Sequence, residues 1–233
     1  MAHAHHSRGL TGNQLKILAL IFMTADHIGL QLLPEFPALR CIGRLAFPVF
    51  AWMIAEGCRY THDKKGYLLR LGALAGVCQV VYFAAMGSLY QCVLVTFFLS
   101  ALLIFTYHRA AVEGSFRSRG VFLLLAAGVV FLAAVLPALL SATDYAIDYG
   151  LWGIALPLGI YAGKTRLHKL GMLTLGLIGL AVCYGGIQWL GLGAVPLLAL
   201  YNGRRGTHKI GTFFYLYYPA HLVVLFGISL LLT

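Results

Sequence analysis

The chain has 233 residues, of which 61% are hydrophobic and only 10% are charged. Its mean hydropathy of +0.85 excludes an ordinary soluble domain. The formal charge of +10 is in the range of nucleic-acid-binding proteins. Here, however, the basic residues alternate with apolar segments and do not gather in a tail or on one face, as phosphate-binding residues do. We therefore expect a membrane protein with no nucleic-acid partner.

Apolar segments long enough to cross a bilayer recur along the chain, since a spanning helix needs about 20 mainly apolar residues. They are residues 14–33, 41–58, 67–86, 90–108, 120–141, 149–163, 170–185, 187–200 and 212–232. The sequence thus predicts an all-α, polytopic integral membrane bundle of about 9 transmembrane helices, with a range of about 8 to 10. The Gly- and Pro-rich segments between 149 and 200 are short, so we expect one or two of them to be broken or tilted.

The rest of the domain organisation is simple. Residues 1–13 are expected to form a cytoplasmic tail, disordered or in part an expression scar. Residues 14–233 are expected to form a single transmembrane domain, because no loop is long enough to bury a core of its own.

The Lys and Arg residues predict the orientation. With a cytoplasmic N-terminus, every second loop is basic and the loops between them, residues 87–90 and 142–148, carry no Lys or Arg, as the positive-inside rule requires. Arg40 is the exception on the outer side. The basic residues placed inside are Arg8, Arg59, Lys64, Lys65, Arg109, Arg117, Arg119, Lys164, Arg166, Lys169, Arg204, Arg205 and Lys209.

A few polar residues lie within the predicted spans, where a charge costs roughly 2.5–3.5 kcal/mol and usually marks a cavity or a functional site. They are Lys16, Asp26, His27, Arg44, Glu56, Arg70, Gln79, Asp148, Gln188 and His221. Counting residues from the helix ends places His27, Arg44 and Asp148 together in the outer half of the membrane. The same count places Tyr217, Tyr218 and His221 in an inner layer.

Helical phase separates Asp26 from His27. Lys16 lies on the same face as His27, about three turns below it, whereas Asp26 points about 100° away. We therefore expect Asp26 to contact a group on a neighbouring helix. Purely structural roles stay open: Arg44, Glu56 and Arg70 lie near helix ends, and His221 could bond a carbonyl across helices.

Several motifs resemble the TraX family of conjugal-transfer membrane proteins, and the similarity runs along nearly the whole chain. They are Leu15-Lys16, Thr24-Ala25-Asp26-His27-Ile28-Gly29, Gly43-Arg44-Leu45-Ala46-Phe47-Pro48-Val49-Phe50-Ala51, Ala55-Glu56-Gly57, Arg70, Asp148-Tyr149-Gly150 with Gly153, and Tyr218-Pro219-Ala220-His221. The family is named for a protein that acetylates the N-terminus of F-type pilin. It is similar to a wider superfamily of transmembrane acyltransferases, in which an intramembrane histidine near the end of an early helix is the proposed catalytic residue. By position His27 matches that histidine.

The resemblance implies a multi-pass acyltransferase of the bacterial inner membrane. It would use acetyl-CoA as acyl donor, without metal or haem, and an acceptor such as a pilin-like N-terminus, a small amine or an envelope glycan. We expect His27 to act as general base or acyl carrier and Arg44 to stabilise the oxyanion, with Asp26 and Asp148 in support. The residues expected to bind the donor are Lys16, Glu56, Arg59, Arg70, Arg204, Arg205, Lys209, Tyr218 and His221.

Three other functions fit the same residues. A transporter or channel would use the intramembrane Asp, His and Arg groups as a proton or ion relay. A haem protein would use His27 and His221 as axial ligands, although the sequence places them at different depths. A non-enzymatic scaffold would use the buried polar set for stability alone.

Overall fold

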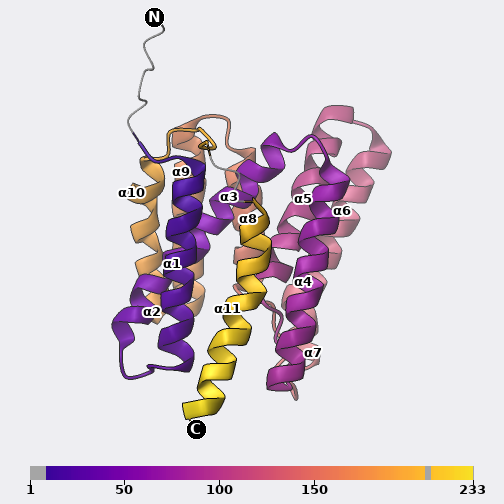
Figure 1. The fold of residues 1–233 in the computed structure, drawn as a ribbon. Coiled ribbons are helices and arrows are strands. Elements are labelled where there is room, and N and C mark those ends of the chain that lie inside the picture. Colours follow the sequence, from indigo (N-terminus) through magenta and orange to yellow (C-terminus); the bar gives the residue numbers. More distant parts are fainter. Residues whose placement is uncertain (1–8, 208–210, 233) are drawn as a thin grey trace, which may run out of the picture. The chain divides into compact units, whose positions relative to one another are not determined.

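The computed structural model describes residues 9–207 and 211–232, and Figure 1 shows its helices. Every regular element among these described residues is helical, and they include no β-strand beyond two isolated bridges. The predicted all-α class is therefore confirmed.

The chain forms two compact units that divide it inside one helix. Unit 1 comprises Met1–Met53 and Gly186–Thr233, and unit 2 comprises Ile54–Gly185. The boundary falls within α3 (Ala46–Tyr60). The single membrane domain expected from the sequence stays a prediction.

Unit 1 brings the first helices of the chain together with the last. Its elements besides the start of α3 are α1 (Gly12–Gln31), α2 (Pro37–Gly43), the 3-10 helix η2 (Gly186–Gly193), α10 (Ala194–Ala199) and α11 (Gly211–Leu232). Helix α1 packs against both α2 and α11. In Figure 1, α1 and α11 run in the same direction. The broken form predicted for part of 149–200 is confirmed by η2 and α10.

Helix α1 begins two residues before the predicted span. Thr11 caps its N-terminus, and Gln14 returns a side-chain bond to the Thr11 N–H in a capping box. Leu10 exchanges backbone hydrogen bonds with Leu200 and Asn202. Residues 10–13 therefore belong to the fold, whereas the predicted tail reached residue 13, because local capping and pairing satisfy their backbone groups.

The predicted second span, residues 41–58, is divided between α2 and α3 at Arg44 and Leu45. Pro48 explains the break, because a proline has no N–H to donate to the carbonyl four residues earlier and its ring crowds that carbonyl. That carbonyl belongs to Arg44. The proline therefore interrupts the helix after Gly43, where α2 ends. It lies in the first turn of α3, where a proline is compatible with the start of a helix.

Unit 2 consists of consecutive helices. After α3 come α4 (Lys64–Met86), α5 (Val93–Glu113), α6 (Phe116–Val130), the π-helical turn η1 (Phe131–Val135), α7 (Leu136–Leu139), α8 (Gly150–Ala162) and α9 (Arg166–Tyr184). Helix α5 packs against α4, α6 and α8, and α8 also packs against α9. The apolar core gathers around α5 and includes Leu99, Leu103 and Ile154.

Five helical segments among the described residues are long and apolar enough to cross a membrane: Pro37–Tyr60, Lys64–Met86, Val93–Glu113, Phe116–Leu139 and Arg166–Tyr184. Gly150–Ala162, Gly186–Ala199 and Leu216–Leu232 are shorter apolar helices. Helix α1 is not among either group. Its interior polar residues, Lys16, Asp26 and His27, lower its hydropathy. The chain is thus a helical membrane protein, while the count of about 9 spans and the cytoplasmic side of the N-terminus stay predictions.

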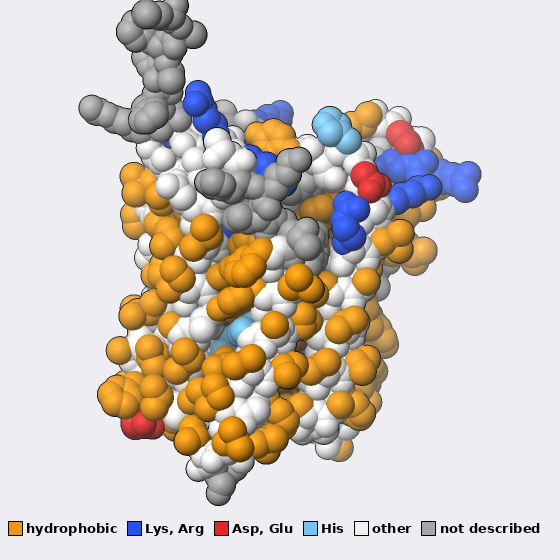
Figure 2. Space-filling model, in the orientation of Figure 1, with side chains coloured by type: hydrophobic (Ala, Val, Ile, Leu, Met, Phe, Trp, Pro, Cys, Tyr) orange, Lys and Arg blue, Asp and Glu red, His pale blue; other side chains and the backbone are white. Residues whose placement is uncertain are grey.

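Charge is distributed unevenly over unit 2. The turns that follow α3, α5 and α8 lie at one end of its helices in Figure 1, and the basic residues of the unit lie in these turns and the helix ends around them. The opposite turns, residues 87–92 and 140–149, carry no Lys or Arg. On the face drawn in Figure 2, hydrophobic side chains cover the flanks of the helices and the blue side chains keep to this end. This arrangement agrees with the loop pattern from which the orientation was predicted.

Candidate functional site

Asp26 joins α1 to α2 through two arginines. Its carboxylate accepts a hydrogen bond from Arg40 at 2.6 Å and a second from Arg44. The two arginines are four residues apart, so they share one side of α2 and its C-terminal turn. Gly43 makes the approach possible, because a Cβ on this residue would overlap Asp26. The prediction that Asp26 contacts a neighbouring helix is confirmed.

This Asp26 cluster, defined as Asp26, Arg40 and Arg44, carries two positive charges and one negative charge. The side chain of Arg44 is only 9% exposed, and that of Asp26 is 15% exposed. Breaking such a buried pair leaves a desolvated charge, which is why both partners matter for stability. Arg40 was missing from the predicted site. Two features of the sequence could have indicated it: it lies four residues before Arg44, and it is the exception to the positive-inside rule on the outer side.

His27 lies on a different face of α1 and contacts α11. Its ring meets that of His221 edge to face, with the ring centroids 5.1 Å apart and the planes at 72°. A hydrogen bond also fixes the register between α1 and α11, since the Thr24 hydroxyl and the Tyr217 hydroxyl lie 2.7 Å apart. Thr24 gives its single O–H to the carbonyl of Leu20, so Tyr217 is the donor to Thr24.

The predicted depth of His221 is therefore wrong. Counting residues placed His221 in an inner layer and His27 in the outer half, whereas the two rings touch. The error arose because each depth was counted from an assumed helix end, while the packing of α11 against α1 sets the actual register. This contact also contradicts the haem alternative, because two imidazoles in direct contact leave no gap for a porphyrin ring between them.

Both histidines are anchored through the same ring nitrogen. The Nδ1 atom of His27 lies 2.8 Å from the carbonyl oxygen of Met23, and the Nδ1 atom of His221 lies 3.0 Å from that of Tyr217. A carbonyl oxygen only accepts hydrogen bonds, so each Nδ1 carries the proton of the neutral ring. Each Nε2 atom is then left with a lone pair, the form that a base or nucleophile requires.

The ring of His221 is held on several sides. Tyr217 stacks on it at 5.4 Å with the planes 11° apart, and Tyr218 meets it edge to face at 5.3 Å. Tyr218 and His221, both predicted for an inner layer, thus lie together, but the His221 ring is beside His27.

A group of cations lies at the N-terminal end of α1. Lys16 places its ammonium 5.6 Å from the ring centre of Phe214 on α11. The carbonyls of Arg204 and Arg205 accept the N–H groups of Gly12 and Asn13, which satisfies the first turn of α1 and holds this segment beside it. Lys16 and His27 both contact α11, which agrees with the prediction that they share one face of their helix. Lys209, the remaining basic residue predicted for this region, lies outside the described residues.

In unit 2, the predicted donor-binding residues have structural partners. Glu56 accepts a hydrogen bond from Lys169 at 2.6 Å, and both side chains are largely buried. Arg59 donates to the carbonyl of Tyr161 and lies over its ring at 4.9 Å. Arg70 forms an exposed ion pair of 3.4 Å with Asp63. The pairing of Lys169 with Glu56 was not predicted, because the two residues are far apart in the sequence.

Asp148 also lies in unit 2, just before α8. Its carboxylate accepts a hydrogen bond from the Tyr90 hydroxyl at 2.8 Å, and its carbonyl accepts one from Thr96 at 2.6 Å. Burial, and then the negative charge of Asp148, raise the pKa of Tyr90, which keeps the phenol protonated as a donor. Tyr149 follows with a φ of 59°, a left-handed conformation that is uncommon for a residue with a side chain. The predicted joint action of Asp148 with Arg44 stays a prediction.

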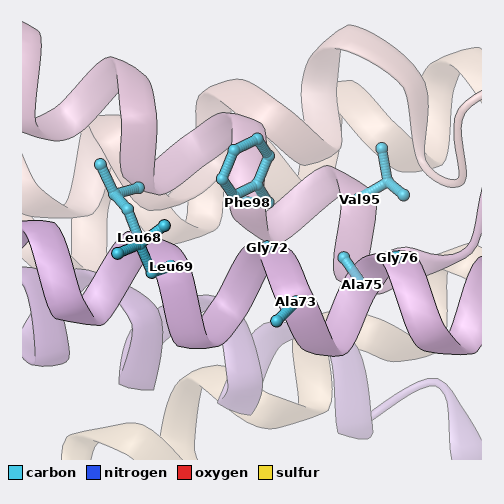
Figure 3. A pocket seen from close by; sticks show the side chains of 8 residues that line it. All are labelled: Leu68, Leu69, Gly72, Ala73, Ala75, Gly76, Val95 and Phe98. Carbon is cyan, nitrogen blue, oxygen red and sulfur yellow. The ribbon is translucent and has the colours of Figure 1, made fainter.

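An apolar groove of about 620 Å³ runs along α4 and α5 (Figure 3). The residues that line it are Leu68, Leu69, Gly72, Ala73, Ala75, Gly76, Val95 and Phe98. None of these side chains can exchange a proton or carry a charge, so this groove offers no group for acid–base chemistry. In unit 1, the residues that can exchange protons or carry charge lie along α1, α2 and α11.

Comparison with known proteins agrees with the motifs. The family model described as TraX protein matches residues 11–229. The chain is 26% identical to the probable fimbrial assembly protein FimC, serogroup H1, of Dichelobacter nodosus over 236 aligned positions, which cover 91% of this chain and 93% of that protein. An uncharacterized protein of Rickettsia prowazekii (strain Madrid E) is 39% identical over 69 residues, 30% of this chain and 27% of that protein. No solved structure gives a significant match. Because the family model covers nearly the whole length, the chain belongs to the TraX family.

Proposed function

We propose that this protein is an integral membrane acyltransferase, which moves an acetyl or other short acyl group from cytoplasmic acyl-CoA to an amine or hydroxyl acceptor reached from the outer side of the membrane. The observation that carries the proposal is the His27 imidazole, which is held by its Nδ1 atom so that the Nε2 lone pair is left to act as a base or nucleophile. Membership of the TraX family supports the same reaction class.

His27 has the form that acyl transfer requires. Its Nε2 atom takes the proton from the acceptor nitrogen or oxygen, which then attacks the thioester carbonyl. A new C–N or C–O bond forms, the C–S bond breaks, and the proton ends on the CoA sulfur. In the alternative order, Nε2 itself attacks the thioester, carries the acyl group briefly and passes it to the acceptor.

The Asp26 cluster supplies the positive charge that this reaction needs. Asp26 is the chain neighbour of His27, and its carboxylate binds both Arg40 and Arg44. One carboxylate between two guanidinium groups leaves a net positive charge. A fixed positive charge in a low-dielectric site stabilises the oxyanion of a tetrahedral intermediate. Arg44 is the stabilising group in this proposal and Asp26 orients it.

The donor would approach along α1. Lys16, Arg204 and Arg205 lie at the N-terminal end of this helix, and Lys16 is eleven residues before His27, which corresponds to about 16 Å along the helix axis. With the N-terminus in the cytoplasm, these cations bind the CoA phosphates and the acyl end extends toward His27. Arg59, Arg70, Glu56 and Lys209 stay candidates for donor binding on the sequence alone.

The acceptor belongs to the cell envelope in this proposal, and the protein to the bacterial inner membrane. A relative that matches nearly the whole chain is named as a probable fimbrial assembly protein. This name supports a pilin-like N-terminus as the acceptor, with a small amine or an envelope glycan as the other candidates.

The test is acyl transfer by the purified protein in detergent, with radiolabelled acetyl-CoA as donor. We expect His27→Ala to lower the rate by about 10²–10⁴-fold, the usual contribution of a positioned acid–base group. His168→Ala is the matched control, because this histidine is exposed on α9, and it should keep the wild-type rate. Full transfer by His27→Ala would refute the assignment. Ion flux in proteoliposomes without acetyl-CoA binding would favour a transporter instead.

A further inference from the structure

His221, the second histidine of the ring pair, has a buried nitrogen whose presence does not contribute to the stability of the fold. His221 is only 7% exposed, and its Nε2 atom is buried with no hydrogen-bond partner in the described structure. A buried acceptor left unpaired is unfavourable, and such atoms are uncommon in folded proteins. An apolar ring in the same place would avoid this cost, so the position suits a group that meets a proton during function.

The surroundings of His221 keep this nitrogen in place. The Nδ1–H group is bonded to the carbonyl of Tyr217, and the rings of Tyr217 and Tyr218 pack against the imidazole. The ring is thus fixed both by a hydrogen bond and by packing. A side chain that only filled space would not need such an anchor.

His221 is the neighbouring base that can accept a proton from His27. In a serine-protease-like triad, a carboxylate stabilises the protonated imidazole. Here the nearby carboxylate, Asp26, is bonded to Arg40 and Arg44 instead. The ring in direct contact with His27 is that of His221, 5.1 Å away between centroids.

We propose that His27 and His221 form an acid–base pair, in which His27 removes the proton from the acceptor and His221 delivers it to the departing CoA sulfur. This proposal rests on the acyltransferase function proposed above. The acceptor nitrogen or oxygen attacks the thioester carbonyl and forms the new C–N or C–O bond, while its N–H or O–H bond breaks and the proton moves to Nε2 of His27 and on to Nε2 of His221. The C–S bond then breaks, and the sulfur takes the proton from His221. Both imidazoles finish neutral, each with its proton on Nδ1, so the cycle is balanced.

The role of His221 can be tested by comparing two acyl donors whose leaving groups differ in basicity. A CoA thiolate is basic and benefits from a proton as it leaves, whereas the nitrophenolate released from p-nitrophenyl acetate is a weak base that leaves without one. His221→Asn keeps a donor for the Tyr217 carbonyl and removes Nε2. His221→Gln serves as the second variant, and His168→Asn on the exposed surface of α9 is the matched control.

We expect His221→Asn or His221→Gln to lower kcat with acetyl-CoA by about 100-fold or more, with little change in KM, and to alter the rate with p-nitrophenyl acetate by less than about threefold. A merely structural role would lower both rates together. Equal losses with the two donors, or no loss with acetyl-CoA, would overturn the pair while leaving the acyltransferase function intact. If the wild-type protein used neither donor, the acyltransferase function itself would fail.

Discussion

Replacing Asp26 with asparagine tests whether the buried charge of Arg44 depends on the negative charge of Asp26 for its stability. The change keeps the size and a hydrogen-bond acceptor of the side chain but removes its negative charge. Arg44 would then be an almost fully buried cation, and Arg40 would lose the negative charge that lies 2.6 Å away. The substitution thus isolates the charge from the packing.

The expected loss of stability follows from these contacts. A hydrogen bond to a charged group contributes about 1.5–3 kcal/mol, and removing one partner of a buried ion pair costs about 3–5 kcal/mol. Arg40 is partly exposed and its share is screened by solvent, so we expect about 3–5 kcal/mol in total for Asp26→Asn. For a chain of this length, the corresponding fall in Tm is about 6–20 °C.

The assay is thermal unfolding of the purified protein in detergent, followed by circular dichroism. Asp63→Asn is the matched control, because Asp63 forms an exposed ion pair with Arg70 and caps α4 through Gly66. Asparagine caps helices as well as aspartate does, and an exposed pair contributes only about 0–1 kcal/mol. If Asp26→Asn were as mild as this control, the reasoning about buried compensation would be refuted. Adding Arg44→Met to Asp26→Asn should recover part of the loss, since the uncompensated charge is then removed.

Two further predictions concern the packing of the other polar groups. Glu56→Gln should destabilise the protein by about 3–5 kcal/mol, because it leaves the largely buried Lys169 without its charge partner; a Tm equal to that of the wild type would contradict this. Gly43→Ala should cost about 1–3 kcal/mol, since the added Cβ overlaps Asp26 and separates α1 from α2. Gly171→Ala, where a Cβ meets open space, is the control, and equal stability of the two alanine variants would show that Gly43 does not set the approach of the helices.

The local features of this protein follow from its sequence. Composition and hydropathy determine a helical membrane protein, because a backbone surrounded by lipid must satisfy its own hydrogen bonds. Helical phase correctly separates Asp26 from His27 and places Lys16 on the side of His27, since these relations depend only on the pitch of one helix. Pro48 marks the interruption of the second span for an equally local reason.

Contacts between helices that are distant in the sequence were decided only by the tertiary structure. Thr24 and Tyr217 are 193 residues apart, and their bond sets the register that brings His221 to His27. A count of residues along each helix could not find this register, because it depends on how side chains of α1 and α11 interdigitate. The pairing of Glu56 with Lys169 has the same origin. Periodicity within one helix specifies which face a residue occupies, whereas packing between helices specifies what that face meets.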